Sequence, residues 1–188
     1  MYRPKLFTGI DLDRRTRESC AEISGRLQAQ GLPAKFEPAQ KLHVTLAFLG
    51  WVEPERVEAI EGVLRSVAFE FKPFTLTLDR VGAFPHERRP RVVWIGSRQQ
   101  GEAFRALAHN LRDAYARIGF TFDKDAVAHV TIARIKGGHS HLPLLDIKPM
   151  RLRVRKLTLF ESLPDGKTTR YEPRAYAALQ GGGERGSE

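Results

Sequence analysis

The sequence predicts an α+β fold of two related lobes around a pseudo-twofold axis, with two mostly antiparallel sheets facing a central cleft and helices on the outer faces. Two observations lead to this prediction. Segments in which apolar and polar residues alternate, as in half-buried strands, are interspersed with segments in which apolar residues recur every three or four positions, as in amphipathic helices. In addition, the strand-like segment His43–Ala47 (HVTLA) recurs as His129–Ala133 (HVTIA), a little under half the chain later.

The first half of the chain alternates strands and helices with recognisable ends. Thr16 is a suitable N-cap for a first helix, and Gly31 and Pro33 end it. Pro54 opens a second helix, because proline is favoured at the first helical position. In order, we expect a strand over residues 5–12, a helix over 16–30, a strand over 43–49, a helix from residue 54 and a strand over 74–81.

The second half repeats this order. A helix over 102–118 has the clearest apolar stripe, and Gly119 ends it in a left-handed conformation. Strands are expected over 91–95, 127–133, 151–161 and 169–175, and a loop rich in Gly, His and Pro over 136–150. Residues 1–180 should therefore form a single domain of two interleaved lobes, and residues 181–188, which have no apolar anchor, should form a disordered tail.

The composition excludes several classes of protein. No apolar run approaches the roughly 18 residues needed to cross a bilayer, and the N-terminus lacks a signal-peptide core. Cys20 is the only cysteine, which excludes an internal disulfide and any zinc ribbon and agrees with a reducing cytoplasm. The 31 Lys and Arg residues against 22 Asp and Glu give a net charge of +9, which favours a polyanionic partner such as nucleic acid. We expect a cytoplasmic monomer without membrane contacts.

The first copy of the repeated motif places a histidine and a threonine on one side of a strand. Because successive side chains of a strand point to opposite faces, His43 and Thr45 share one face while Val44 and Leu46 share the other. By the same alternation, Phe48 should point to the core.

The second copy presents His129 and Thr131 on one face in the same way. If the lobes face each other, two histidines and two threonines converge on one cleft. A neutral imidazole can take a proton from water while a protonated one gives a proton to a leaving oxygen, so this set suits phosphate-ester chemistry without a metal. Threonine hydroxyls can donate to non-bridging phosphate oxygens, and Arg134 would add a charge-assisted contact to the same phosphate.

At these residues the sequence resembles the two-histidine (2H) phosphoesterases, and among them the LigT/ThpR-like RNA 2′,3′-cyclic phosphodiesterases, also called 2′-5′ RNA ligases. The hallmark of that family is two His-x-Thr-x motifs, which residues 43–46 and 129–132 match. The segment 42–50 (LHVTLAFLG) resembles the first family motif with its flanks, and segments 74–84, 91–96 and 129–134 resemble further family segments in the expected order. The resemblance covers roughly residues 3–175.

The resemblance implies a bilobal fold with a V-shaped cleft and hydrolysis of 2′,3′-cyclic phosphate RNA ends to 2′-phosphate ends. His43 would donate a proton to the departing 3′ oxygen, and His129 would be the base that activates water. Thr45, Thr131 and Arg134 would bind the phosphate, and no metal or other cofactor is implied. In the reverse direction, the resemblance implies 2′-5′ ligation to a 5′-hydroxyl RNA end without ATP, for example of tRNA halves.

Other interpretations of these residues remain open. The same site could act on a small cyclic nucleotide, a cyclic ADP-ribose phosphate or a 2′-5′-linked oligonucleotide, or the cleft could bind RNA ends without turnover. Arg151, Arg153 and Arg155 share one face of a predicted strand. They could line a route for the RNA backbone beyond the phosphate, or they could form a solvated face that blocks aggregation.

Overall fold

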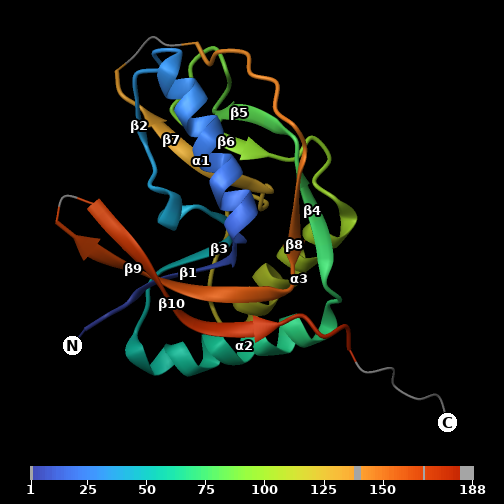
Figure 1. Ribbon diagram of the computed structural model, residues 1–188. Coiled ribbons are helices and arrows are strands. Elements are labelled where there is room, and N and C mark those ends of the chain that lie inside the picture. Colours follow the sequence, from blue (N-terminus) through green and yellow to red (C-terminus); the bar gives the residue numbers. More distant parts are fainter. Residues whose placement is uncertain (1, 138–140, 167, 183–188) are drawn as a thin grey trace.

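The computed structural model describes residues 2–137, 141–166 and 168–182 of the 188-residue chain. It contains one eight-stranded sheet, in which seven strands follow the order β10-β9-β1-β3-β7-β6-β5 and β2 pairs with β7, and a second sheet of β4 and β8 (Figure 1). All strand pairs are antiparallel. The predicted α+β class with antiparallel sheets is confirmed, although the sheets of the two lobes join into one.

The elements alternate along the chain much as the sequence predicts. In order they are β1 (Lys5–Asp11), α1 (Arg14–Ala29), β2 (Ala34–Phe36), β3 (His43–Trp51), α2 (Val57–Glu70), β4 (Phe74–Leu78), β5 (Arg80–Phe84), β6 (Val92–Gly96), α3 (Glu102–Arg117), β7 (His129–Ile135), β8 (Met150–Val154), β9 (Lys156–Asp165) and β10 (Thr168–Ala178). Short 3-10 turns at Ala39–Lys41 and Pro54–Arg56 precede β3 and α2.

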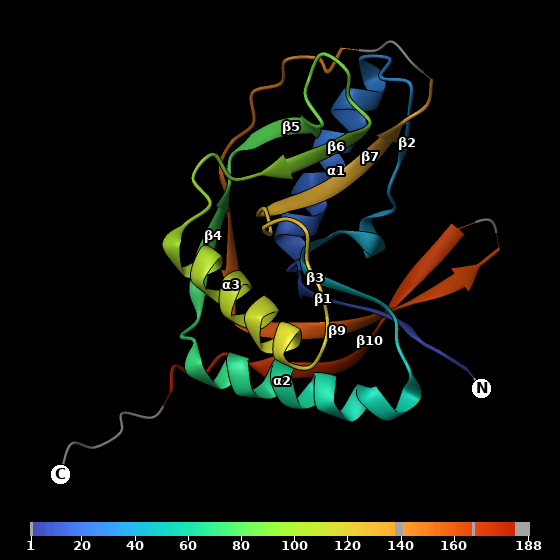
Figure 2. The ribbon, with the colours of Figure 1, turned by 180° about the vertical axis from the view of Figure 1, so that it is seen from behind.

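The helices of each half cover the strands of the other half. Helix α1, which lies between β1 and β3 in the chain, packs against β7, and α3, which lies between β6 and β7, packs against β3. Helix α2 packs against α3, β9 and β10 at the other end of the molecule (Figures 1 and 2). Because the helices cross over in this way, the apolar back of each strand group is buried by residues from the other half of the sequence.

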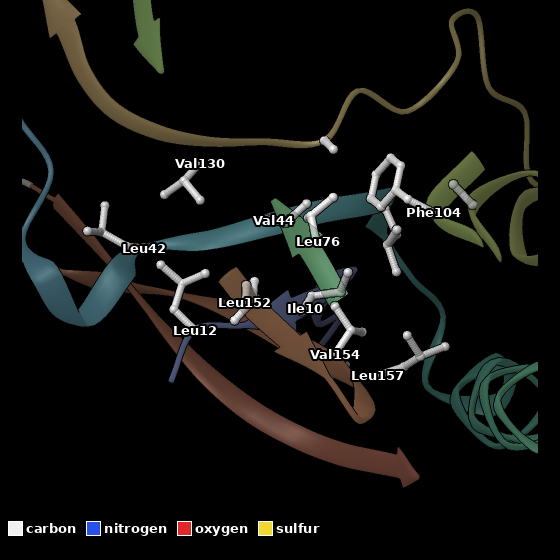
Figure 3. Packing of buried hydrophobic residues seen from close by; sticks show 14 of the residues in the cluster. Ile10, Leu12, Leu42, Val44, Leu76, Phe104, Val130, Leu152, Val154 and Leu157 are labelled. Atoms are coloured by element: carbon white, nitrogen blue, oxygen red, sulfur yellow. The ribbon is translucent and has the colours of Figure 1, made fainter. Parts of the chain in front are cut away.

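The two-stranded sheet β4–β8 fills the space behind the centre of the large sheet. Its inward side chains Leu76, Leu152 and Val154 are buried in the same apolar cluster as Val44 and Val130 (Figure 3). The alternate residues of β8, Arg151 and Arg153, point outward and are exposed. The two-stranded β4–β8 sheet, called the ribbon below, therefore packs on the side of the large sheet that faces away from the cleft.

Three local predictions were wrong for identifiable reasons. Asp13, and not Thr16, is the N-cap of α1, because the Asp13 carboxylate accepts a 2.7 Å hydrogen bond from the Thr16 backbone N–H. The predicted strands 74–81 and 151–161 are each two strands, interrupted at Asp79 and Arg155, where the chain passes from the ribbon to the large sheet. Strand β2 was not predicted, since its three residues lie in a polar stretch too short to show alternation.

The far end of the chain is partly described. Gly181 and Gly182 donate backbone hydrogen bonds to the carbonyls of Phe71 and Phe69, at 3.0 and 2.6 Å, so the chain stays packed just past residue 180. The rest of the predicted tail, residues 183–188, lies outside the described residues. None of the helices in the described part of the chain combines the length and apolar character required to cross a membrane.

The ribbon gives a test of the fold. We expect Leu152→Ala to lower the free energy of unfolding by about 2–5 kcal/mol, because Leu152 is 1% exposed and its removal leaves a cavity behind the central strands. Urea denaturation followed by circular dichroism measures this loss. The matched control is Arg153→Ala on the exposed face of the same strand, which should change stability by less than about 0.5 kcal/mol. Equal losses in the two variants would contradict the assigned orientation of β8.

Candidate active site

Strands β3 and β7 meet at one residue pair in the middle of the large sheet. Val44 and Val130, the second residues of the two repeated motifs, are direct antiparallel partners, and their side chains are buried on the helix side. The residues that flank them therefore point to the opposite side. In this antiparallel register, the segment before Val44 lies across from the segment after Val130, so His43 neighbours Thr131 and Thr45 neighbours His129. The two motifs converge on one cleft.

Each motif strand carries a β-bulge at the same point of the repeat. In β3, Gly9 of β1 pairs with Thr45 and Thr8 pairs with Ala47, so Leu46 has no partner. In β7, the corresponding unpaired residue is Ile132. A bulge inserts one extra residue, which reverses the alternation of the side chains that follow it, as far as the next bulge.

The bulges bring Phe48 and Arg134 to the cleft side. The prediction that Phe48 points to the core was wrong: its side chain is 68% exposed and lines the cleft together with Thr45 and His129. Arg134, which occupies the equivalent place in the second motif, is also exposed and lies on the face of His129 and Thr131. Without the bulges, strict alternation would place both side chains on the helix side.

The two imidazoles are held in the same way. The Nδ1 of His43 lies 2.7 Å from the carbonyl oxygen of Lys41, and the Nδ1 of His129 lies 2.8 Å from that of Val127. Since a carbonyl oxygen only accepts, each Nδ1 carries the proton and each Nε2 is left as the nitrogen with a free lone pair in the neutral imidazole. The Nε2 of His43 lies 3.0 Å from the Thr45 hydroxyl. Within the described part of the chain, the Nε2 of His129 has no hydrogen-bond partner.

Aromatic rings enclose both imidazoles. His43 lies 4.8 Å from Phe7 and meets the edge of Tyr171 at 5.2 Å between ring centroids. His129 meets Phe84 at 5.0 Å and lies near Trp94. Strand β1 approaches so closely that a Cβ on its Gly9 would lie 2.7 Å from the carbonyl oxygen of Val44, and 3.6 Å from the His43 ring, so only glycine fits there.

Burial lowers the pKa of both histidines below their ordinary value of 6.5. For His43, desolvation is the largest cause and the charge of His129 adds to it, while the Lys41 carbonyl and the carboxylates of Asp11 and Glu37 act in the opposite direction. For His129, desolvation lowers the pKa and only the hydrogen bond to the Val127 carbonyl opposes it. Carboxylates thus favour the proton on His43 and have no comparable effect on His129.

An ion-pair cluster lies beside His43 and Arg134. The Glu37 carboxylate contacts the Arg134 Nε at 3.4 Å and the Lys41 Nζ at 3.2 Å. Lys41 also donates to the Thr169 hydroxyl at 3.2 Å and lies 5.0 Å from the centre of the Tyr171 ring. Glu37, Lys41 and Tyr171 were not predicted from the sequence, since they lie outside the repeated motif and come together only through contacts between distant segments.

A cavity of about 860 Å³ opens on the His129 side of the cleft. It extends between the loop before β7 and the end of β5, and its lining combines aromatic and cationic side chains with the motif residues. The residues that matter here are Thr45, Phe48, Phe84, Phe122, Lys124 and His129. On the His43 side, by contrast, the ion-pair cluster and Tyr171 occupy the equivalent space. The cleft is therefore pseudo-symmetric at its centre and asymmetric at its ends.

The arginines of β8 do not line this cleft. The side chains of Arg151 and Arg153 point away from the buried face of the β4–β8 sheet. That buried face packs on the side of the large sheet opposite His43. This orientation argues against the RNA route considered for them and favours a solvated face. Cys20 is buried in the core, and burial raises the pKa of its thiol to about 12. Among the described residues, no three His, Cys, Asp or Glu side chains lie close enough together to hold a metal ion.

The chain belongs to the family described as LigT like phosphoesterases. This family matches the sequence twice, over residues 10–94 and again over residues 95–171. Each match contains one copy of the repeated motif, which agrees with the duplication visible in the sequence and in the paired bulges. The family expected from the two His-x-Thr-x motifs is confirmed.

Characterised relatives and solved structures agree with this assignment. An RNA 2′,3′-cyclic phosphodiesterase of Archaeoglobus fulgidus is 40% identical over 70% of this chain and 73% of its own length. The protein of that name from Escherichia coli is 34% identical over 93% of this chain and 96% of its own. A crystal structure of E. coli LigT complexed with 3′-AMP superimposes with a TM-score of 0.79 at 31% identity, over 95% of this chain and 99% of that one.

The lowered pKa values predict how stability depends on pH. An imidazole whose pKa is lower when folded than when unfolded binds its proton more weakly in the folded state, so acid favours unfolding. The contribution is fully present above pH 6.5, and it is lost as the pH falls from 6.5 through the lowered folded values. Urea midpoints of the wild type should therefore fall between pH 8 and pH 5 by more than those of the His43→Gln/His129→Gln double variant.

The control for this comparison is His109→Gln. His109 is 72% exposed on α3, outside the cleft, so its replacement should not reproduce the smaller loss of stability in acid that is expected for the double variant. Equal losses of stability in the wild type and the double variant would contradict the burial of the two histidines.

Proposed function

We propose that this protein is a metal-independent RNA 2′,3′-cyclic phosphodiesterase that hydrolyses 2′,3′-cyclic phosphate ends to 2′-phosphate ends. The observation that carries this proposal is the pair of imidazoles whose Nδ1 protons are held by backbone carbonyls and which lie on the same face of the sheet, beside the Val44–Val130 pair. Its family and the activity named for its relatives support the same reaction.

In the proposed mechanism, His129 is the base and His43 is the acid. The Nε2 of His129 removes a proton from water, and the water oxygen attacks the phosphorus of the cyclic phosphate. The bond from phosphorus to the 3′ oxygen breaks, and the protonated Nε2 of His43 gives its proton to that oxygen. The product carries a 2′-phosphate and a free 3′-hydroxyl.

Electrostatics support this division of roles. The carboxylates of Asp11 and Glu37 favour the protonated form of His43, which is the form that an acid needs at the start of the reaction. His129 lacks such an influence and lies beside the open cavity, where water has access. The two histidines have similar local geometry, and these carboxylates support the assignment of His43 as the acid and His129 as the base.

The phosphate is bound by neutral and charged donors. The hydroxyls of Thr45 and Thr131 lie on the cleft face next to the opposite histidine and can donate to the non-bridging oxygens. Arg134, five residues after His129, is a cation on the same face as the motif residues. Its guanidinium can offset the charge that develops on these oxygens in the transition state.

Hydrolysis of a short RNA with a 2′,3′-cyclic phosphate end, in the presence of EDTA, tests the proposal. We expect the wild type to produce a 2′-phosphate end, and we expect His43→Ala and His129→Ala each to lower kcat by about 10²–10⁴-fold, the usual contribution of a general acid or base. His109→Ala should retain full activity, because this residue is exposed on α3. Undiminished turnover by either site variant would refute the two-histidine mechanism.

The pH dependence of the reaction gives a second test. The kcat/KM profile reports the free enzyme, so it should be bell-shaped, with the base His129 controlling the acid limb and the acid His43 controlling the alkaline limb. Because the pKa of each histidine is below 6.5, the maximum should lie on the acid side of pH 6.5. A rate that stays flat from about pH 5 to 8 is incompatible with acid–base catalysis by these residues.

Transfer to an alcohol is the second candidate function. A 5′-hydroxyl RNA end in place of water would give a 2′-5′ linkage without ATP, with the same two proton transfers. The cavity beside His129 has a volume of about 860 Å³ and is lined by Phe48, Phe84 and Phe122, so it has room for the nucleotide that would bear the attacking 5′-hydroxyl. RNA ends, including those of tRNA halves, are the proposed partners, and a monomer in the cytoplasm is the proposed state.

A further inference from the structure

Glu37 connects two cations at the edge of the cleft. Its Oε1 lies 3.4 Å from the Nε of Arg134, and its Oε2 lies 3.2 Å from the Nζ of Lys41. The side chains of Glu37 and Lys41 are only 15% and 13% exposed, whereas that of Arg134 is 61% exposed. A nearly buried carboxylate thus contacts an arginine that extends into solvent.

The backbone of Glu37 is fixed to the strand that carries Arg134. The Glu37 N–H donates a 2.8 Å hydrogen bond to the carbonyl of Ile132, the bulge residue of β7. This bulge is what brings Arg134 to the cleft face. The backbone N–H of Glu37 thus holds the strand that carries Arg134, and its carboxylate contacts the Arg134 guanidinium directly.

Lys41 extends the connection to the other lobe. Its carbonyl accepts the Nδ1–H of His43, and its ammonium group contacts Thr169 and the ring of Tyr171 on β10. Through Lys41, the Glu37 carboxylate links Arg134 on β7 to the immediate surroundings of His43 on β3.

We propose that Glu37 is a positioning residue that holds the Arg134 guanidinium at the cleft before the phosphate binds. Glu37 contacts the Nε edge, so the two terminal nitrogens remain available for phosphate oxygens. An exposed arginine without such a partner would lose side-chain freedom on binding, at the expense of affinity. The inference rests on the proposed function, because it assigns Glu37 a task in phosphate binding at that site.

Among the residues that the structure describes, this network occurs on one side of the pseudo-twofold axis only. At the spacing of the motif repeat, the counterpart of Glu37 in the second half of the chain is Asp123, which is exposed at the cavity, and the counterpart of Arg134 in the first half is Phe48. The Glu37 network therefore accompanies the arginine and is absent where an aromatic side chain replaces it, within the residues described for that half.

The same carboxylate acts on His43, which supplies a second measurable effect. The charged and titratable groups around His43 are Asp11 on β1, Glu37 and Lys41 before β3, His129 on β7 and Tyr171 on β10. The Glu37 charge raises the pKa of His43, so removing it should lower this pKa and shift the alkaline limb of kcat/KM to lower pH.

The experiment compares Glu37→Gln, Glu37→Asp and the Glu37→Gln/Arg134→Ala double variant with the wild type and with Arg134→Ala. For Glu37→Gln, we expect KM for the cyclic-ended RNA to rise about three- to tenfold, the range for one side chain that must be immobilised on binding, with a much smaller change in kcat. Glu37→Asp should recover part of the loss. In the Arg134→Ala background, Glu37→Gln should have no further effect on KM.

The matched control is Glu161→Gln. Glu161 is a buried carboxylate that pairs with Arg174 on β10, outside the cleft, so its loss should affect stability and leave KM unchanged. Binding of inorganic phosphate, measured by calorimetry, gives a readout that needs no turnover, and Glu37→Gln should weaken it by a similar factor.

Two results would overturn the inference. One is a Glu37→Gln protein that binds phosphate as tightly as the wild type, and the other is an equal loss with and without Arg134. Absence of wild-type turnover would instead refute the proposed function, while the phosphate-binding comparison would still decide the role of Glu37.

Discussion

The pairing of Val44 with Val130 is the contact on which the site depends. It is the single pair that joins β3 to β7, and it makes one sheet from the strands of two lobes. Because the two valines are buried from behind by the β4–β8 ribbon and by the crossed helices, the residues on either side of them face the cleft. This apolar contact brings two histidines that are far apart in the sequence to the same face of one sheet.

The bulges in β3 and β7 add two further side chains to the face of the sheet that carries the histidines. A regular strand presents every second residue, so it could offer a histidine and a threonine to the cleft but not the residue five positions after the histidine. The extra residues Leu46 and Ile132 change this parity and add Phe48 and Arg134 to the cleft face. The two copies of the motif therefore share one backbone geometry but differ in the residue five positions after the histidine, which is Phe48 in the first copy and Arg134 in the second.

Acid–base chemistry needs two histidines with different protonation, although the fold makes their local geometry nearly equal. Both donate Nδ1–H to the carbonyl two residues earlier, and both are desolvated. The difference comes from residues outside the repeat. Asp11 and Glu37 act on His43, while His129 opens onto a large cavity. The symmetric part of the protein positions the two histidines alike, and the asymmetric part gives them different electrostatic surroundings.

The sequence alone determined the α+β class, most helices and strands, the duplication, and the two His-x-Thr pairs, because periodicity and repetition are local properties that survive in a linear pattern. The breaks at Asp79 and Arg155 were not predicted, although two consecutive polar residues interrupt the alternation at each of them (Asp79–Arg80 and Arg155–Lys156). A bulge within a single strand produces the same kind of interruption, so only the tertiary structure shows that the chain changes sheets there. The orientation of Phe48 and the Glu37–Lys41 network were likewise decided by tertiary structure. A bulge depends on the register of a neighbouring strand, and an ion pair across lobes depends on how distant segments meet, so neither leaves a local signature in the sequence.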